Sequence, residues 1–375
     1  MKYYLISGEA SGDLQCSQLI HALKKLAPKG DFRAWGGDLM QKEGAVLVKH
    51  YRELALMGFW EVLSHLPTIL RNISFCKKDI LRYMPDVIIY VDYPGFNLRI
   101  AKWAKNKGFK NHYYISPQVW AWKENRIKQM KATLDSLYVI LPFEKKYFEQ
   151  EHNFPVHYVG HPLMDHLSKY SRDPKFCEKN NLTPKKPIIA LLPGSRLQEI
   201  RKMLPIFNKI ASQFKKFQFV VAGAPGIDPK QYSQFMKSNS LNFVHNKTYQ
   251  LLLNSCAALV TSGTATLETA LLNIPQLVCY KCSPITYWIG KKVIKLKYIS
   301  LVNLILEKEA VIELIQNDCT YEKLVLELET LLQKKSLKKM NQNYITLKEK
   351  IGGSGASEKT AKLIFDSIRN NNFKN

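Results

Sequence analysis

The sequence repeatedly joins a short apolar run to a turn rich in Gly, Pro or Ser, and then to a segment with helical spacing of apolar residues. Residues 3–7, 85–91 and 188–192 are three of these runs. Short apolar runs bounded by turn residues are typical of buried strands. Because the runs alternate with helical segments, the sequence predicts an α/β fold with doubly wound, Rossmann-like sheets.

The alternation is interrupted by a charged stretch at residues 163–187 that contains several Pro residues. A chain of 375 residues also exceeds the usual size of a single core. We therefore predict two Rossmann-like domains, at residues 1–165 and 166–345, that face each other across a cleft. Residues 346–375 contain a Gly-rich turn and a helical segment, and we expect this tail to pack back on the first domain.

The formal net charge of +24 is high for a chain in which 46% of the residues are hydrophobic. Such a charge favours an anionic partner: nucleic acid, an anionic membrane surface or a phosphorylated substrate. A general surplus of Lys would give the same charge without any partner. Because the sequence contains no nucleic-acid-binding motif, we expect no nucleic acid partner.

Seven Cys residues without the spacing of a disulfide framework favour a reducing compartment. The sequence has neither the apolar core of a signal peptide nor the uncharged stretch of about 18 residues that a membrane span needs. Cys279 and Cys282 form a lone CxxC pair, and no metal-ligand cluster accompanies it. We therefore expect a cytoplasmic protein without metal or cofactor, either free or peripheral on a membrane.

The turn after residues 188–192 has the features of a phosphate site. Gly194 allows a tight turn, Ser195 stands at the expected N-cap of the next helix, and Gln198 would complete a capping box. Free backbone N–H groups and the helix dipole favour an anion there, and Arg196 can add a bidentate contact. An ordinary turn with a surface Arg is the alternative.

A second Gly turn opens a helix after residues 257–261. Gly263 and Thr264 lie at its start, and Glu268 follows about one turn later, where a carboxylate can accept the hydroxyls of a ribose. A Glu that complements the helix dipole is the alternative. Further along, Asn303 is a lone amide in apolar surroundings.

Polar residues also follow the predicted strands of the first half. Glu9, Ser11 and Asp13 come after the first strand, where Gly12 allows close backbone approach. The pattern is not the dinucleotide-binding GxGxxG motif. Asp92 follows residues 85–91 and could serve as a general base, although a turn or cap is the commonest role of such an Asp.

Three segments rich in aromatic or apolar residues have alternative interpretations. The loop after residues 112–115 begins at Ser116 and carries Trp120 and Trp122, which could stack on a ring or only wedge the loop. Residues 54–70 are strongly apolar and form either a core helix or a surface for lipid or acyl chains. The basic, aromatic residues 281–297 could contact anionic head groups or remain a solvated face.

Taken together, these motifs resemble one family, the lipid A disaccharide synthases, which are glycosyltransferases with the two-domain GT-B fold. The segments that carry the resemblance are residues 7–13, 56–63, 85–97, 114–122, 141–144, 160–162, 191–196, 262–268 and 298–304. Each segment alone is weak evidence for the family, but the presence of all of them in this order is specific to it. The resemblance runs from residue 1 to about residue 320.

The resemblance implies an inverting transfer of 2,3-diacylglucosamine from its UDP conjugate to the 6-hydroxyl of 2,3-diacylglucosamine 1-phosphate. The products are UDP and the β-1,6-linked disaccharide precursor of lipid A. It also implies peripheral association with an anionic membrane surface, the cytoplasmic face of the inner membrane of Gram-negative bacteria. Oligomers are possible in this family, and no metal is required.

The family pattern assigns roles to individual positions. Asp92 would be the catalytic base, and the donor UDP would be held by Gly194, Ser195, Arg196, Gly263, Thr264, Glu268 and Asn303. The acceptor side would include Glu9, Ser11, Gly12, Asp13, Ser116 and Trp120. Met57, Phe59, Trp60 and Leu63 would contact acyl chains or the membrane. The alternatives are another GT-B enzyme, such as a UDP-N-acetylglucosamine 2-epimerase, and a non-catalytic nucleotide-binding protein.

Overall fold

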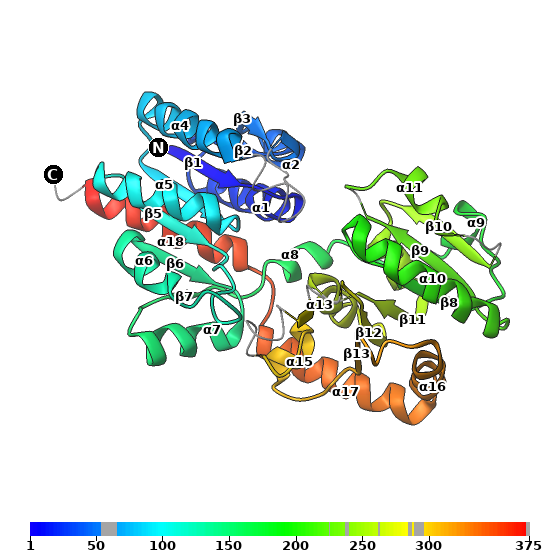
Figure 1. Ribbon diagram of the computed structural model, residues 1–375. Coiled ribbons are helices and arrows are strands. Elements are labelled where there is room, and N and C mark those ends of the chain that lie inside the picture. Colours follow the sequence, from blue (N-terminus) through cyan, green and yellow to red (C-terminus); the bar gives the residue numbers. More distant parts are fainter. Residues whose placement is uncertain are drawn as a thin grey trace. The chain divides into compact units, whose positions relative to one another are not determined.

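The computed structural model describes residues 1–53, 66–224, 226–236, 240–261, 263–283, 287–288 and 296–372. The chain divides into two compact units (Figure 1). Unit 1 comprises Met1–Pro162 together with Ser354–Asn375, and unit 2 comprises Leu163–Gly353. The chain therefore leaves unit 1 after Pro162 and returns to it at Ser354.

Unit 1 is built on a parallel sheet whose described strands lie in the order β3-β2-β1-β4-β5-β6-β7. The strands are β1 (Lys2–Ser7), β2 (Asp31–Gly36), β3 (Val46–His50), β4 (Val87–Val91), β5 (Asn111–Tyr114), β6 (Ser136–Val139) and β7 (His157–Tyr158). All residues of β4 are buried, as expected for a central strand covered on both faces.

Helices cover both faces of this sheet, and α4, α5 and α6 pack on the face opposite to α1 and α18 (Figure 1). The helices are α1 (Ala10–Leu26), α2 (Asp38–Lys42), α4 (Leu66–Tyr83), α5 (Pro94–Asn106), α6 (Arg126–Thr133), α7 (Pro142–Lys146) and α18 (Ala356–Asn372). A 3-10 helix (Tyr51–Glu53) and a π-helix (Tyr147–Glu151) complete the unit. Because α18 packs on α1, unit 1 is built from two distant parts of the chain.

A buried polar network joins α4 to the sheet of unit 1. Asp79 on α4 is only 5% exposed, and its carboxylate accepts two hydrogen bonds from the Arg33 guanidinium at 2.8 and 2.6 Å. It also accepts one from the Tyr4 hydroxyl at 2.7 Å, and that hydroxyl accepts one from the Trp35 indole at 2.9 Å. Burial raises the pKa of Asp79, but these hydrogen bonds outweigh it and leave the pKa below its ordinary value.

Unit 2 repeats the plan, with its described strands in the order β10-β9-β8-β11-β12-β13, all parallel. The strands are β8 (Ile188–Leu192), β9 (Gln218–Gly223), β10 (Leu241–His245), β11 (Ser255–Val260), β12 (Gln276–Tyr280) and β13 (Glu313–Ile315). The helices are α8 (Leu163–Leu167), α9 (Phe176–Lys179), α10 (Leu197–Gln213), α11 (Pro229–Ser233), α12 (Thr248–Leu253), α13 (Thr264–Leu271), α15 (Leu301–Leu306), α16 (Tyr321–Leu331) and α17 (Lys334–Ile351).

The predicted α/β class with two doubly wound parallel sheets is confirmed. The units observed here meet at Pro162/Leu163 and at Gly353/Ser354, a few residues from the predicted limits of 165/166 and 345/346. Within the described segments, no helix combines the length and the apolar character that a membrane span requires.

Candidate functional site

In both units the strand order reverses at a point inside the sheet. In unit 1 the reversal lies between β1 and β4, and in unit 2 it lies between β8 and β11. Helices on either side of such a switch point run to opposite faces of the sheet, so ligands of doubly wound proteins bind beyond the carboxyl ends of the two strands. The predicted site residues Glu9 and Asp92 follow the unit 1 pair, and Arg196 and Gly263 follow the unit 2 pair.

Close packing brings the two unit 1 loops together. A Cβ on Gly8 would lie 2.6 Å from the Tyr93 ring, and a Cβ on Gly12 would lie 2.3 Å from the Ser7 Oγ. Only Gly fits at these positions, because real Cβ atoms do not approach other atoms so closely. Gly8 therefore lets the loop after β1 lie directly against Tyr93 in the loop after β4, whereas Gly12 lets the first turn of α1 lie against Ser7 at the end of β1.

Asp92 has an unusual and firmly held backbone. Both Asp92 and Tyr93 adopt the left-handed conformation, with φ of 48° and 47°. This costs on the order of 1–2 kcal/mol for each residue. The backbone carbonyl of Asp92 accepts hydrogen bonds from the Asn97 Nδ2 at 2.7 Å and the Tyr113 hydroxyl at 2.5 Å. These contacts fix the direction in which the Asp92 side chain leaves the chain.

The carboxylate of Asp92 is available for chemistry. It is partly exposed, and no side chain or N–H group of the described residues forms a hydrogen bond with it. Burial, and then the negative charge of Glu9, raise the pKa of Asp92 to about 7. A carboxylate with a pKa near the working pH is a more effective general base than an ordinary Asp.

The first turn of α7, which follows β6, carries a second buried carboxylate that the sequence motifs did not indicate. Glu144 is 1% exposed, and burial raises its pKa to about 7. It accepts hydrogen bonds from the N–H groups of Ile140 and Leu141 at 3.0 and 2.8 Å, and from the Trp120 indole at 3.2 Å. The available signal was a Glu three residues after the N-cap Leu141, from where its carboxylate can accept the N–H groups at the start of α7.

Glu144 decides between the two interpretations of Trp120. The Trp120 indole N–H donates to Glu144, and the Trp120 ring lies edge-on to the Phe143 ring with 4.9 Å between their centroids. Trp120 therefore packs against the start of α7 and holds the loop after β5 in place. Ser116 is also buried, and its hydroxyl donates to the Pro117 carbonyl at 3.0 Å. Both residues shape the loop after β5 rather than present free polar groups.

Asp13, expected on the acceptor side, has its carboxylate hydrogen-bonded within unit 1. Its carboxylate is 3% exposed and accepts the N–H groups of Gly37, Leu39 and Met40 at 2.9, 3.1 and 3.0 Å. It therefore caps the N-terminus of α2, which follows β2. Glu9 and Ser11 are exposed at the start of α1, whereas Gly12 is buried. Met57, Phe59, Trp60 and Leu63 lie outside the described residues.

The turn after β8 has a different cap from the one predicted. The N-cap of α10 is Arg196 rather than Ser195, and the capping side chain is Glu199 rather than Gln198. Glu199 Oε2 accepts the N–H groups of Ser195 and Arg196 at 3.1 and 3.3 Å, and its Oε1 accepts the Arg196 guanidinium at 3.2 Å. Gly194, at φ 115°, is required because a Cβ there would lie 2.3 Å from Glu199 Oε2.

The Glu199 carboxylate thus lies where we predicted a bound phosphate from the sequence. Two backbone N–H groups and one guanidinium already converge on its carboxylate, which stands in for an anion at the start of a helix. The Arg196 side chain is 70% exposed, so it can exchange this intramolecular partner for a ligand. The turn has the donors and the charge of an anion site.

The turn after β11 presents a more open surface. Gly263 is the N-cap of α13 with φ 137°, and a Cβ there would meet nothing within 4 Å. Gly263 and Thr264 are both exposed. Glu268 lies one turn inside α13, where one carboxylate oxygen accepts the Tyr249 hydroxyl at 2.8 Å. Burial raises the pKa of Glu268, while the hydrogen bond from Tyr249 lowers it.

Asn303, predicted for the donor site, has its side chain hydrogen-bonded within unit 2. Its side chain is fully buried, and its Nδ2 donates to the Val311 carbonyl and to Glu313 Oε1, both at 2.8 Å. Its Oδ1 accepts the N–H groups of Ala310 and Val311 at 2.7 and 2.9 Å. With every polar group of its side chain paired, Asn303 ties α15 to the segment leading into β13.

Within the part of the chain that the structure describes, no three His, Cys, Asp or Glu side chains are grouped as a metal site would need.

Two doubly wound units, each with polar loops at its switch point, define the GT-B class of glycosyltransferases and related sugar-nucleotide enzymes. A UDP-GlcNAc 2-epimerase from Neisseria meningitidis, bound to UDP-GlcNAc, superimposes with a TM-score of 0.70 at 11% identity, covering 98% of this chain and 100% of that chain. The glycosyltransferase of kitacinnamycin gives 0.64 at 11% identity, covering 98% and 99%. At such identities the likeness concerns the fold.

The chain belongs to the lipid-A-disaccharide synthetase family, whose sequence model matches residues 3–365. A lipid-A-disaccharide synthase of Coxiella burnetii is 36% identical over 376 residues, covering 97% of this chain and 98% of the relative. One of Nitrosococcus oceani is 36% identical over 377 residues, covering 98% and 97%. The resemblance proposed from the ordered motifs is thereby confirmed.

Proposed function

We propose that the protein transfers 2,3-diacylglucosamine from its UDP conjugate to the 6-hydroxyl of 2,3-diacylglucosamine 1-phosphate, with inversion at the anomeric carbon. Membership of the lipid-A-disaccharide synthetase family supports the reaction. The observation that carries the proposal is Asp92, a partly exposed carboxylate with a pKa raised to about 7 on a rigid backbone at a switch point.

Asp92 acts as the general base in this proposal. It accepts the proton of the 6-hydroxyl while that oxygen attacks the anomeric carbon and the bond to UDP breaks. UDP leaves with its negative charge on the diphosphate, where Arg196 and the N–H groups of Ser195 and Arg196 can stabilise it. Gly263 and Thr264 would hold the adjoining phosphate and Glu268 the ribose.

The experiment that tests the function incubates the purified protein with both lipid substrates and follows release of UDP. The disaccharide 1-phosphate and UDP should appear in equal amounts. Release without acceptor, or formation of an epimerised UDP-sugar, would instead support the epimerase alternative. If neither UDP nor disaccharide forms, the assignment is wrong.

Replacing Arg196 should weaken UDP binding. Removing a charged hydrogen-bond donor costs about 1.5–3 kcal/mol, and we expect the lower end because wild-type Arg196 must first release Glu199. The Kd for UDP of Arg196→Ala should therefore rise about 10-fold in calorimetric titration. Arg201→Ala, an exposed Arg on the same helix, is the control and should bind UDP normally. Equal affinity for wild type and Arg196→Ala would remove Arg196 from the donor site.

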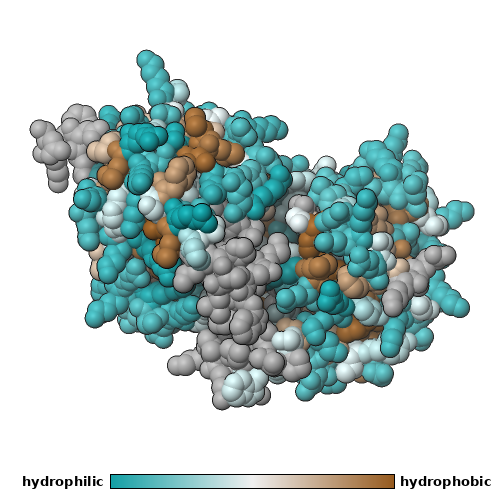
Figure 2. Space-filling model, turned by 45° about the horizontal axis from the view of Figure 1, so that its top comes forward, coloured by the Kyte–Doolittle hydropathy of each residue, from teal (hydrophilic) through white to brown (hydrophobic). Residues whose placement is uncertain are grey.

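We further propose that α4 contacts an anionic membrane surface. Its exposed face includes Leu70, Phe75 and Leu81, which are 55%, 49% and 45% exposed. Arg71 and Lys78 are exposed cations between them, and the exposed Arg82 follows Leu81. Figure 2 shows brown apolar residues among hydrophilic ones in the region of α4. An apolar face flanked by cations is typical of helices that lie in a membrane interface.

Charges placed on this face should weaken membrane binding. We expect the double variant Leu70→Glu/Phe75→Glu to lose most of its cosedimentation with vesicles of anionic phospholipid, because the Glu side chains disfavour both insertion and the negative surface. Leu326→Glu is the control, since Leu326 is 60% exposed on α16 of unit 2. Equal binding by both variants would show that another surface contacts the membrane.

A further inference from the structure

Two cations lie over the ring of an exposed Trp after β5, and a third cation on α5 lies near one of them. The Lys123 Nζ lies 4.3 Å from the centroid of the Trp122 ring, and the Arg126 Cζ lies 5.6 Å from it. Trp122 is 44% exposed. Arg99 on α5 is the third cation. Burial lowers the pKa of Arg126, and the nearby positive charge of Arg99 lowers it further. We call Lys123, Arg126 and Arg99 the cation cluster.

The cation cluster has no counter-charge among the described residues. None of its members forms an ion pair there, although exposed cations elsewhere in unit 1 do. The adjacent Glu124 lies 3.5 Å from the His152 ring nitrogen instead. Burial and the proximity of Arg126 lower the pKa of Lys123. An anion bound among these side chains would remove their mutual repulsion.

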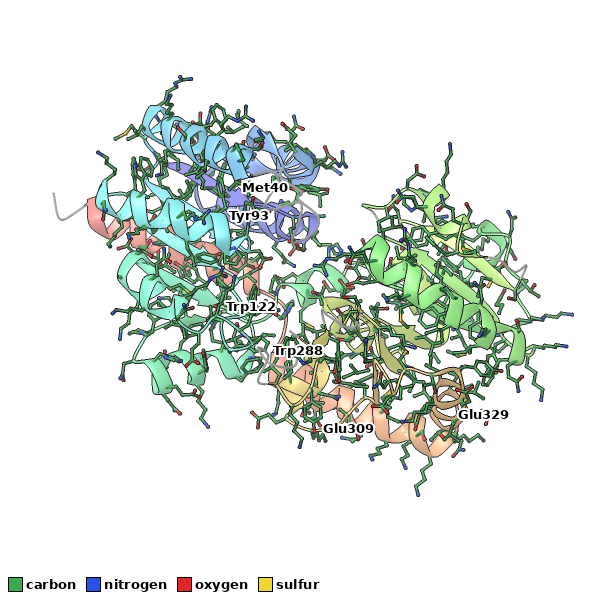
Figure 3. All side chains as sticks on the ribbon, viewed as in Figure 1. Met40, Tyr93, Trp122, Trp288, Glu309 and Glu329 are labelled. Atoms are coloured by element: carbon green, nitrogen blue, oxygen red, sulfur yellow. The ribbon has the colours of Figure 1, made fainter. Side chains whose placement is uncertain are left out.

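The cation cluster is also connected to the proposed base. Arg126 lies near Tyr113. Burial raises the pKa of Tyr113, and the positive charge of Arg126 offsets part of that rise. The hydroxyl of Tyr113 donates to the Asp92 carbonyl at 2.5 Å. Trp122 and Tyr93 both lie at the carboxyl end of the unit 1 sheet (Figure 3). One tyrosine side chain therefore links the cluster to the backbone of Asp92.

The loop that carries the cluster is held in place. Lys123 adopts a left-handed conformation with φ 58°, and its carbonyl accepts the Arg126 N–H at 3.0 Å. The Gln129 side chain donates to the Leu98 carbonyl at 3.0 Å, which joins α6 to α5. Arg126 and Arg99, on these two helices, are therefore positioned relative to each other before any ligand binds.

We propose that the cation cluster binds the phosphate monoester of the acceptor sugar, with Trp122 packed beneath the two cations on its loop. This inference rests on the proposed function, in which the acceptor carries a 1-phosphate and reacts through its 6-hydroxyl. The phosphate is attached to C1 and the 6-hydroxymethyl group to C5, the two carbons that flank the ring oxygen, so different side chains of the protein can hold the two groups. An anion site set apart from Asp92 therefore matches an acceptor whose hydroxyl faces the base while its phosphate faces the cations.

The test compares two acceptors, 2,3-diacylglucosamine 1-phosphate and the same sugar without phosphate. Lys123→Ala/Arg126→Ala should raise the KM for the phosphorylated acceptor at least 10-fold, because charged hydrogen bonds to phosphate are lost. The KM for the UDP-sugar and the rate with the unphosphorylated acceptor should stay unchanged. Lys128→Ala, an exposed Lys on the same helix, is the matched control and should behave as wild type.

The other results contradict the proposal in different ways. Equal losses with both acceptors would mean that the cation cluster only supports the fold. A raised KM for the UDP-sugar would mean that it binds the donor diphosphate. Direct titration of 2,3-diacylglucosamine 1-phosphate separates this inference from the proposed function. Binding that the double variant weakens would support the phosphate site even if wild type released no UDP, whereas equal binding by both proteins would overturn it.

Discussion

Asp92→Asn should lose almost all turnover while retaining normal affinity for UDP. The amide cannot accept the proton of the attacking hydroxyl, and a positioned general base contributes about 10²- to 10⁴-fold to a rate. The substitution preserves the shape of the side chain, and the hydrogen bonds from Asn97 and Tyr113 go to the backbone carbonyl. We therefore expect kcat to fall without unfolding, as measured by UDP release and circular dichroism.

The pH profile gives this prediction a second readout. A base must be unprotonated, so kcat/KM of the wild type should rise with pH through about 7, the raised pKa of Asp92. Asp92→Asn should lack this dependence. Glu9→Gln should move it to lower pH, because the charge of Glu9 raises the pKa of Asp92 after the larger effect of burial. Activity near the wild-type rate in Asp92→Asn would exclude Asp92 as the base.

A matched control comes from the opposite end of the same strand. Asp86 precedes β4, is exposed, and accepts the backbone N–H of Lys2 at 2.7 Å. Asp86→Asn removes the same charge from the same region of the chain, but at the amino end of the sheet. Its turnover should remain close to that of wild type, which would attribute the loss in Asp92→Asn to position rather than to net charge.

Asp79→Asn should destabilise unit 1 by about 3 kcal/mol. Breaking a buried ion pair costs about 3–5 kcal/mol, and we expect the lower end because the Arg33 side chain is 28% exposed. Calorimetry should show the melting transition of unit 1 about 10 °C lower, with that of unit 2 unchanged. The effect should diminish at acidic pH, because the stabilisation by a carboxylate of lowered pKa is lost as pH falls through that pKa.

The control for this stability experiment is an exposed ion pair. Asp318 and Lys323 pair on the surface of unit 2, with side chains 61% and 53% exposed. Exposed pairs contribute at most about 1 kcal/mol, so Asp318→Asn should shift neither transition appreciably. A similar shift for Asp79→Asn and Asp318→Asn would show that the network around Asp79 does not stabilise unit 1 as inferred.

Local patterns predicted the central strands β1, β4 and β8 because each of them is a run of consecutive apolar residues bounded by turn residues. Residues 188–192, predicted as a strand, form β8 with the same bounds, and Asp92 directly follows β4 as predicted. The cap of α10 was misplaced by one residue because Gln198 and Glu199 are both capable partners, and only the backbone geometry selects Glu199. Such a choice depends on the turn at Gly194, which residue spacing alone does not specify.

Two polar residues of the predicted site have hydrogen-bond partners that lie outside their own turn or helix. Asp13 caps a helix that begins more than twenty residues later, and Asn303 accepts N–H groups from the loop before β13. Sequence spacing could not reveal these partners, so a buried cap and a ligand contact looked alike. The cation cluster was missed for the same reason, since Arg99 meets Arg126 only when α5 and α6 pack together.

The return of the chain to unit 1 affects how the protein can be made. Lys25 on α1 pairs with Glu358 on α18 at 3.0 Å, and the Lys110 side chain donates to the Ser367 carbonyl at 2.9 Å. During synthesis, α18 emerges from the ribosome only after all of unit 2 has been translated. Unit 2 can therefore fold first, although its sequence follows most of unit 1. Until then, the nascent chain exposes the apolar face of α1, a natural binding site for chaperones.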